Sequence, residues 1–176
     1  MIRGKTIVLT ELRSADSATL FNWINSPDTV HFNAPYTPIH EPNHTAWFEA
    51  VTNASDRVVF AIREPRTLRL IGIVQLVGLH PIHQTAELII RIGEESDRNR
   101  GAGSEAVQLV TNFAFTDRNL QRVWLRAFTD NPRAIRAYEK AGFKMEGTMR
   151  RTCFVDGRWR DEAIMAILRP LDDRRQ

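Results

Sequence analysis

A chain of 176 residues is long enough for one domain with its own hydrophobic core. Apolar residues make up 43% of the sequence and charged residues 26%, which excludes the disordered, collagen-like and disulfide-scaffold classes. The net charge of +3 is spread along the chain without a basic run that alternates with aromatic residues, so we expect no nucleic-acid partner.

The sequence lacks the signals of membrane insertion and of export. No apolar stretch approaches the roughly 18 to 20 residues of a membrane-spanning helix, and no signal core opens the chain. We therefore expect a cytoplasmic protein with no membrane partner. Cys153 is the single cysteine, so an intrachain disulfide and a cysteine-based metal cluster are both excluded, and its strand-like surroundings predict a small buried side chain.

The first half of the chain predicts a strand, two helices and a β-meander. Alternation of apolar and polar residues indicates the strands, and Ser14 or Asp16 is suited to the N-cap of the first helix. The tryptophan of the second helix, Trp47, has the spacing of a core residue. The expected elements are a strand at 6–12, a helix that buries Leu20, Trp23 and Ile24, a loop over 28–42, a helix from about 43 that buries Trp47, Phe48 and Val51, and antiparallel strands at 57–62, 70–79 and 86–92.

The second half predicts one parallel crossover and a final hairpin. A helix separates the strand that ends at Ile92 from the strand that begins at Val123, which allows these two strands to run parallel. Asn131 precedes Pro132 as a helix N-cap, and Gly142 is a natural helix stop. The expected elements are a helix that buries Ala106, Leu109, Val110 and Phe113, a strand at 123–129, a helix from 131 to 142, and a hairpin of 148–155 and 159–168 around Asp156-Gly157. The expected fold class is α+β, with a twisted, mostly antiparallel sheet of about seven strands.

The segment from Ile90 to Gly103 carries most of the chemical information. A glycine-bearing turn between a strand and a helix exposes backbone N–H groups at the positive helix end, which suits a phosphate or pyrophosphate. Arg98 and Arg100 add positive charge there. The glycine spacing also fits a dinucleotide fingerprint, but an antiparallel meander precedes it and the next strand reaches an acid, Asp130, only after about 30 residues, which disfavours a nicotinamide cofactor.

Two motifs resemble the signatures of the GNAT superfamily of N-acetyltransferases. Arg98-x-x-Gly101-x-Gly103 is similar to its acyl-CoA signature, Q/R-x-x-G-x-G/A. The run from Asn131 through Tyr138 to Phe143 is similar to its second signature, N-x-x-A-x-x-x-Y-x-x-x-G-F. The resemblance covers nearly the whole chain and implies a single domain over 1–176. The N-terminal helices, the meander and the last hairpin resemble the branch of ribosomal-protein-alanine and spermidine/spermine acetyltransferases, although the 93–97 segment is a residue longer than the tightest form of the family's loop.

This resemblance implies an enzyme that transfers an acetyl group from acetyl-CoA to a primary amine, without a metal. It implies that the two parallel strands splay apart and that the pantetheine arm inserts between them. Asn131 contacts this arm in relatives, and it is equally well explained as a helix cap. The residues expected at the cofactor are Ile90, Arg91 and Ile92 for the arm, Arg98, Asn99, Arg100, Gly101, Ala102, Gly103 and Ser104 for the pyrophosphate, and Asn131.

The resemblance also suggests two catalytic residues. Tyr138 matches the tyrosine proposed to protonate the departing thiolate, while a plain core aromatic is the alternative. An alkylamine with a pKa near 10.4 must lose a proton before it attacks, so a base or a water chain is needed. Glu87 matches a glutamate that works through water in some relatives; its alternatives are a solvent-facing role, and His80 or His83 as the base.

The acceptor is left open by the sequence. Phe32, Tyr36 and Glu41 are the residues expected to contribute to its site, with Trp47 near them. A small-molecule polyamine, a protein N-terminus, an aminosugar and an aminoglycoside all fit a primary-amine site. A catalytically inactive acyl-CoA-binding or sensor domain is the alternative function, and a homodimer is a further expectation because dimers are common among relatives.

Overall fold

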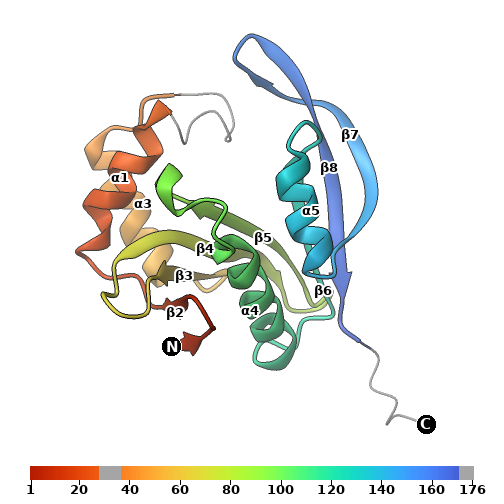
Figure 1. Ribbon diagram of the computed structural model, residues 1–176, viewed down its shortest axis with the longest axis horizontal. Helices are drawn as coiled ribbons and strands as arrows, with labels where there is room; N and C mark the ends of the chain where they lie inside the picture. Colours follow the sequence, from red (N-terminus) through yellow and green to blue (C-terminus); the bar gives the residue numbers. More distant parts are fainter. Residues whose placement is uncertain (28–36, 171–176) are drawn as a thin grey trace.

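The computed structural model describes residues 1–27 and 37–170 (Figure 1). Within these ranges the α-helices are α1 (Asp16–Asn25), α3 (Glu41–Asn53), α4 (Ala102–Thr116) and α5 (Pro132–Lys140), and η1 (Glu95–Asp97) is a 3-10 helix. The strands are β1 (Ile2–Arg3), β2 (Val8–Thr10), β3 (Arg57–Arg63), β4 (Leu70–His80), β5 (Thr85–Ile92), β6 (Arg122–Phe128), β7 (Lys144–Val155) and β8 (Arg158–Leu168).

The strands form one eight-stranded mixed sheet in the order β1-β2-β3-β4-β5-β6-β8-β7. The pair β5 and β6 is parallel, and the other neighbouring strands are antiparallel. Helix α4 links the parallel strands, because a parallel pair needs a crossover connection. This confirms the α+β class and the crossover, and the strand beyond the seven expected is the two-residue β1 at the sheet edge.

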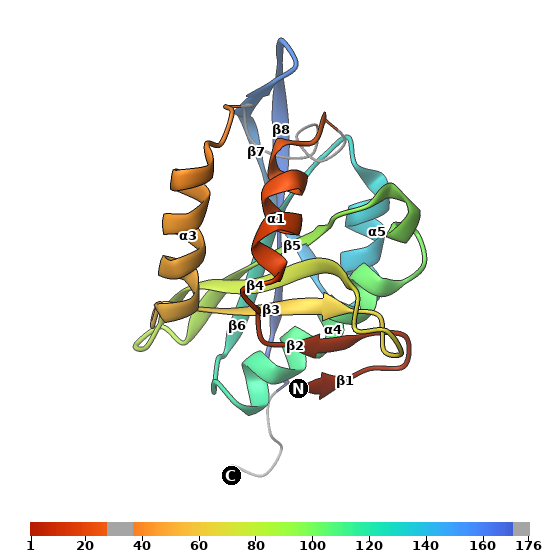
Figure 2. The ribbon, with the colours of Figure 1, turned by 90° about the vertical axis from the view of Figure 1, so that its left-hand side faces the viewer.

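Helices cover both faces of the sheet (Figures 1 and 2). Neighbouring residues of a strand point to opposite faces of the sheet. Ile62 of β3 therefore lies in a larger apolar cluster with Ala106 and Val110 of α4, and Ala61 lies in a smaller cluster on the other face. The smaller cluster contains Trp23 and Leu20 of α1, with the half-buried Phe48 of α3 packed against it. The two faces therefore differ in their helices: α4 lies on one and the α1–α3 pair lies on the other.

Several boundaries and the burial of two residues differ from the sequence expectation. Helix α3 begins at Glu41 within the expected loop, because Pro42 occupies a first-turn position that needs no N–H donor. Strand β7 begins at Lys144, because Lys144 and Met145 already pair with β8. Trp47 was expected in the core, but it is 37% exposed on α3. Cys153 is half-buried rather than buried, since β7 is the last strand of the sheet.

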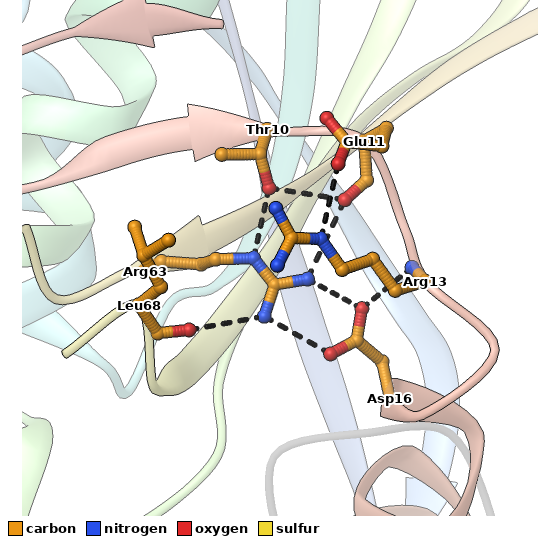
Figure 3. A network of polar contacts seen from close by, with 6 residues as sticks. All are labelled: Thr10, Glu11, Arg13, Asp16, Arg63 and Leu68. Carbon is orange, nitrogen blue, oxygen red and sulfur yellow. Dashed lines mark hydrogen bonds and ion pairs between the residues drawn. The ribbon is translucent and has the colours of Figure 1, made fainter.

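Asp16 is not the N-cap of α1. That position is held by Ala15, without a side-chain cap, while the Asp16 carboxylate accepts hydrogen bonds from Arg63 at 2.6 and 3.0 Å (Figure 3). Arg63 also donates to Thr10 Oγ1 at 2.8 Å, and Asp16 and Arg63 are 5% and 3% exposed. A buried guanidinium needs a paired acid, and this requirement outweighs local capping. The pair fixes the start of α1 to β2 and β3.

Candidate functional site

A cavity of about 640 Å³ opens where β5 and β6 separate. Its walls come from the end of β5, the loop between β5 and α4, the first turn of α4 and one face of α5. It brings together ten of the residues singled out in the sequence: Ile90, Arg91, Ile92, Arg98, Asn99, Gly101, Gly103, Ser104, Asn131 and Tyr138.

The parallel ladder that leads to this cavity is short. Strands β5 and β6 pair at three positions, and the last of these joins Glu87 to Trp124. Beyond it β5 still pairs with β4 as far as Ile92, and β6 with β8 as far as Phe128. The edge of β5 that faces β6 therefore has backbone groups without a strand partner from Leu88 onward. Buried backbone groups require partners, so this edge is suited to an extended ligand that completes the ladder.

The loop that follows β5 is braced by contacts from distant parts of the chain. Trp23 Nε1 of α1 donates to Glu94 Oε1 at 2.6 Å. Arg69 forms a two-pronged ion pair with Asp97, with both hydrogen bonds at 2.7 Å, and this guanidinium holds the pKa of the Asp97 carboxyl below its usual value. Arg98 Nη2 donates to the carbonyl of Gly93 at 2.8 Å. The loop is thus held in one shape before a ligand arrives.

The packing of Trp23 against this loop allows a direct test at Gly93. A Cβ added to Gly93 would lie 2.0 Å from Trp23 Cε2, and Trp23 is itself buried. We expect Gly93→Ala to lower the free energy of unfolding by about 1–3 kcal/mol, because the buried ring and the loop must move apart, and to weaken acetyl-CoA binding. Thermal unfolding and calorimetric titration measure both effects.

Gly147→Ala is the matched control for this substitution. A Cβ at Gly147 meets no atom within 4 Å and the residue does not have a positive φ, so its stability should change by less than about 0.5 kcal/mol. Equal effects at the two glycines would contradict the packing argument.

The start of α4 points an uncapped helix end at the cavity. Gly101 occupies the N-cap position with φ of +87°, a conformation that favours glycine, and no side chain caps the helix there. Gly103 and Ser104 of the first turn line the cavity. The free N–H groups and the positive end of the helix dipole suit a phosphate, and Arg98 adds a positive charge on the same wall. This wall fits the pyrophosphate of an acyl-CoA, and the free edge of β5 fits its pantetheine arm.

Asn131 is the cap of α5 that the sequence predicted, and it also faces the cavity. Its side chain caps α5 by accepting a hydrogen bond from the Ala134 backbone at 3.2 Å, and the residue also lines the cavity. The cap fixes the side-chain orientation, which leaves its remaining polar groups close to any ligand of the cavity.

Tyr138 reaches the cavity from the same face of α5 as Asn131. Its ring lies 6.2 Å from that of Phe143, centroid to centroid, and packs against the larger apolar cluster. Burial raises the pKa of Tyr138 to about 12, because the apolar surroundings disfavour the phenolate. The hydroxyl therefore stays protonated at neutral pH and is available as a proton donor.

The ionisation of Tyr138 can be followed by the absorbance of tyrosinate. In the folded protein we expect the tyrosinate absorbance of wild type and of Tyr138→Phe to be the same until the pH comes within about one unit of 12. In denaturant the wild type should show one additional tyrosine that titrates near 10. Since the pKa is raised on folding, the stabilising effect is complete below about pH 10 and is lost as the pH rises toward 12. A Tyr138 that titrates near 10 in the folded state would contradict its burial.

Other sequence-selected residues lie outside the cavity lining. Arg100 is exposed, Ala102 is buried in the core, and Glu41 is exposed at the first turn of α3. Phe32 and Tyr36 lie outside the described residues. The cavity also contains residues that the sequence analysis did not select: Pro27, Glu95, Asp97, Val107, Arg133, Ala134 and Ala137. Of these, Ala134 and Ala137 could have been found from the helical spacing that begins at Asn131.

Glu87 lies at the last position of the parallel ladder and is largely buried. Its Oε1 accepts a hydrogen bond from Arg126 Nε at 3.0 Å, and its side chain is 16% exposed. Arg126 is also within ion-pair distance of Glu162, with Nη1 and Oε2 separated by 3.6 Å. Glu87 is therefore at the point where the strands part, held by an arginine, and does not line the cavity itself.

Among the described residues, no group of three or more His, Cys, Asp or Glu side chains is arranged to hold a metal ion. None of the helices in the described ranges is long and apolar enough to cross a membrane.

Similarity to known proteins defines the class to which this fold and cavity belong. Residues 6–144 match the model of the acetyltransferase (GNAT) domain, so the chain belongs to the GNAT family. It is an acetyl-CoA-dependent N-acetyltransferase, which confirms the resemblance carried by the two signatures.

Its relatives include enzymes that act on polyamines. The chain is 29% identical over 164 residues to a spermidine N(1)-acetyltransferase of Vibrio cholerae, with 92% of each chain covered. It is 25% identical to the probable N-acetyltransferase YjcK of Bacillus subtilis, over 99% of this chain and 100% of the relative. The crystal structure of spermidine N-acetyltransferase from Vibrio cholerae in complex with CoA and spermine has a TM-score of 0.84 at 25% identity, with 93% of this chain and 95% of that chain covered.

Proposed function

We propose that this enzyme acetylates a polyamine such as spermidine or spermine, by direct attack of a primary amine on the thioester of acetyl-CoA. The observation that carries the proposal is the position of Glu87 and Tyr138 around the splayed strands. The parallel ladder ends at Glu87, and Tyr138 lines the cavity that begins beyond it. An acid at the point where the strands part and a proton donor in the adjoining cavity are the two groups that this reaction needs.

The cavity residues divide into two groups for holding acetyl-CoA. The backbone of Ile90, Arg91 and Ile92 supports the pantetheine arm along the free edge of β5. The turn with Gly101 and the start of α4 bind the pyrophosphate through N–H groups, with Arg98 as the nearby cation. Arg133, which also lines the cavity, adds a second cation from the first turn of α5. Bound acetyl-CoA supplies the reactive thioester, and these residues hold it against α5.

The acceptor class follows from charge as well as from the relatives. Glu87 and Glu162, two largely buried carboxylates, lie beside the end of the ladder. A polyamine is polycationic at neutral pH, so acidic side chains favour it over a neutral acceptor. The relatives named for spermidine, and the bound spermine in one structure, support the same class. Glu41, exposed at the start of α3, is a further carboxylate for a distant ammonium group.

The proton transfers are assigned to these two residues. Glu87 receives the proton of the acceptor ammonium, directly or through a water chain, and so generates the neutral amine that attacks. Tyr138 donates its hydroxyl proton to the sulfur as the carbon–sulfur bond breaks, and it is reprotonated, directly or through solvent, by the second proton that the attacking nitrogen loses as the amide forms. Holding the amine and the acetyl carbon together supplies most of the acceleration, and backbone N–H groups along the free edge of β5 are placed to stabilise the developing oxyanion.

Direct attack predicts that no acetyl group is transferred to the protein itself. Cys153 is the one thiol of the chain, and burial together with the negative charge of Glu162 raises its pKa, so it stays a poor nucleophile at neutral pH. Mass spectrometry after incubation with acetyl-CoA alone should find unmodified protein, and addition of spermidine should give acetylspermidine. Cys153→Ala should retain this activity. An acetylated enzyme that passes its acetyl group to spermidine would overturn direct attack.

A further inference from the structure

Arg126 is shared by two carboxylates at the mouth of the splayed strands. It lies on β6 two positions beyond Trp124, the last residue of the parallel ladder. Its Nε is 3.0 Å from Glu87 Oε1, which makes a hydrogen bond, while its Nη1 is 3.6 Å from Glu162 Oε2, which is an ion pair without a hydrogen bond. In this arrangement Arg126 forms a hydrogen bond with Glu87 but only a longer ion pair with Glu162.

Glu162 is the less satisfied of the two acids. The residue is 8% exposed, and its Oε2 has no hydrogen-bond partner among the described residues. A buried carboxylate oxygen without a donor is costly, and such groups in native proteins call for a specific explanation. The nearest charged donor is the guanidinium of Arg126, which has only to close the remaining distance to supply the missing hydrogen bond.

Arg126 is able to move between the two acids. Its side chain is 42% exposed, in contrast to the largely buried carboxylates of Glu87 and Glu162. Burial lowers its pKa, but the hydrogen bond that it donates to Glu87 and the charges of both acids raise it by more, so the guanidinium stays charged. Arg126 therefore pairs with the carboxylate of Glu87, with which the ammonium group of a cationic acceptor must also pair.

We propose that Glu162 is a positioning residue that draws Arg126 off Glu87 when the ammonium group of the acceptor arrives. This rests on the proposed function, in which Glu87 receives the acceptor's proton. In the bound state the ammonium pairs with Glu87, and Arg126 completes its hydrogen bond with Glu162 Oε2.

Charge explains why the second acid is needed. Two carboxylates and one guanidinium leave this group of residues with a net negative charge, so a further cation is attracted to it. Without Glu162, Arg126 and Glu87 would form a neutral pair, and the ammonium would have to displace the arginine with no acid to receive it. Removal of one partner from such a group leaves an uncompensated charge, which is unfavourable in a buried site.

Steady-state kinetics of Glu162→Gln with spermidine test the proposal. We expect kcat/KM for spermidine to fall about tenfold, mainly through a higher KM, because a hydrogen bond to a charged group contributes on the order of 1.5 kcal/mol. The KM for acetyl-CoA should not change. Addition of Arg126→Gln to this variant should restore most of the lost kcat/KM, because Glu87 is then free. A purely structural role for Glu162 would not be rescued by a second substitution, so absence of rescue would overturn the proposal.

Arg126→Gln alone gives an independent result with Glu162 intact, and it decides the question even if Glu162→Gln fails to fold. It should lower the KM for spermidine, since the arginine no longer competes for Glu87; a raised KM would overturn the proposal. Glu146→Gln is the matched control. Glu146 pairs with Arg122, which is on β6 like Arg126, and it forms no ion pair with Arg126. The kinetics of this variant should equal those of wild type. If the wild type transferred no acetyl group to any amine, the proposed function itself would fall, which distinguishes the two failures.

Discussion

Tyr138→Phe is expected to lower kcat by about a hundredfold, at the low end of the range for loss of a general acid. The substitution removes only the hydroxyl, which is protonated at neutral pH because its pKa, raised by burial to about 12, lies far above that range. Without it the thiolate must leave unprotonated or take its proton from water. Stopped or continuous assays of thiol release with saturating acetyl-CoA and spermidine measure the change.

The same variant should leave binding and folding nearly intact. The phenylalanine ring keeps the packing of Tyr138 against Phe143 and the larger apolar cluster. We therefore expect the dissociation constant of acetyl-CoA to change by less than about threefold and the thermal midpoint to stay close to that of wild type. A variant with unchanged kcat would show that Tyr138 is a wall of the cavity and not a proton donor.

Asp16→Asn is expected to lower the free energy of unfolding by about 3–5 kcal/mol. The substitution leaves the Arg63 guanidinium buried without its counter-charge, and Arg63 is 3% exposed (Figure 3). The hydrogen bonds to Thr10 and to the Leu68 carbonyl remain, but neither partner is charged. Urea unfolding followed by tryptophan fluorescence measures the loss.

Asp56→Asn is the matched control for this prediction. Asp56 pairs with Arg57 at 3.0 Å, but this ion pair is on the surface, where water screens it, so its loss should leave the free energy of unfolding close to that of wild type. Replacement of both Asp16 and Arg63 by leucine should recover part of the stability lost in Asp16→Asn, because no buried charge is then left alone. Equal losses for Asp16→Asn and Asp56→Asn would contradict the importance of burial.

Local sequence signals predicted the elements and much of the cavity. Asn131 caps α5, and Gly142 ends that helix with φ of +96°. Asp156 and Gly157 both have positive φ in the β7–β8 turn, as expected for a two-residue hairpin loop. These features depend on a few neighbouring residues, so their patterns could be read from the chain. Ten of the cavity residues were expected, either from the two motifs on α4 and α5 or, for 90–92 of β5, from the family resemblance that these motifs carry.

Contacts between distant residues could not be predicted in the same way. Asp16 has the residue type and the position of a helix cap, but its partner Arg63 is 47 residues away in the sequence. Trp23 and Glu94, which brace the loop that follows β5, are 71 residues apart, and Glu87 and Arg126 are 39 residues apart. Periodicity indicates which face of an element is buried, but it does not specify the residue opposite. The role of Glu162 likewise becomes visible only when β6 and β8 are side by side.

Thiol release from acetyl-CoA against a panel of amines tests the central claim most directly. The panel contains spermidine, spermine, peptides with free N-termini, aminosugars and aminoglycosides. The proposed function predicts release with spermidine or spermine at a kcat/KM well above that for the other acceptors. Release with another acceptor class alone would contradict the polyamine assignment, and no release with any of them, despite acetyl-CoA binding, would contradict catalysis itself.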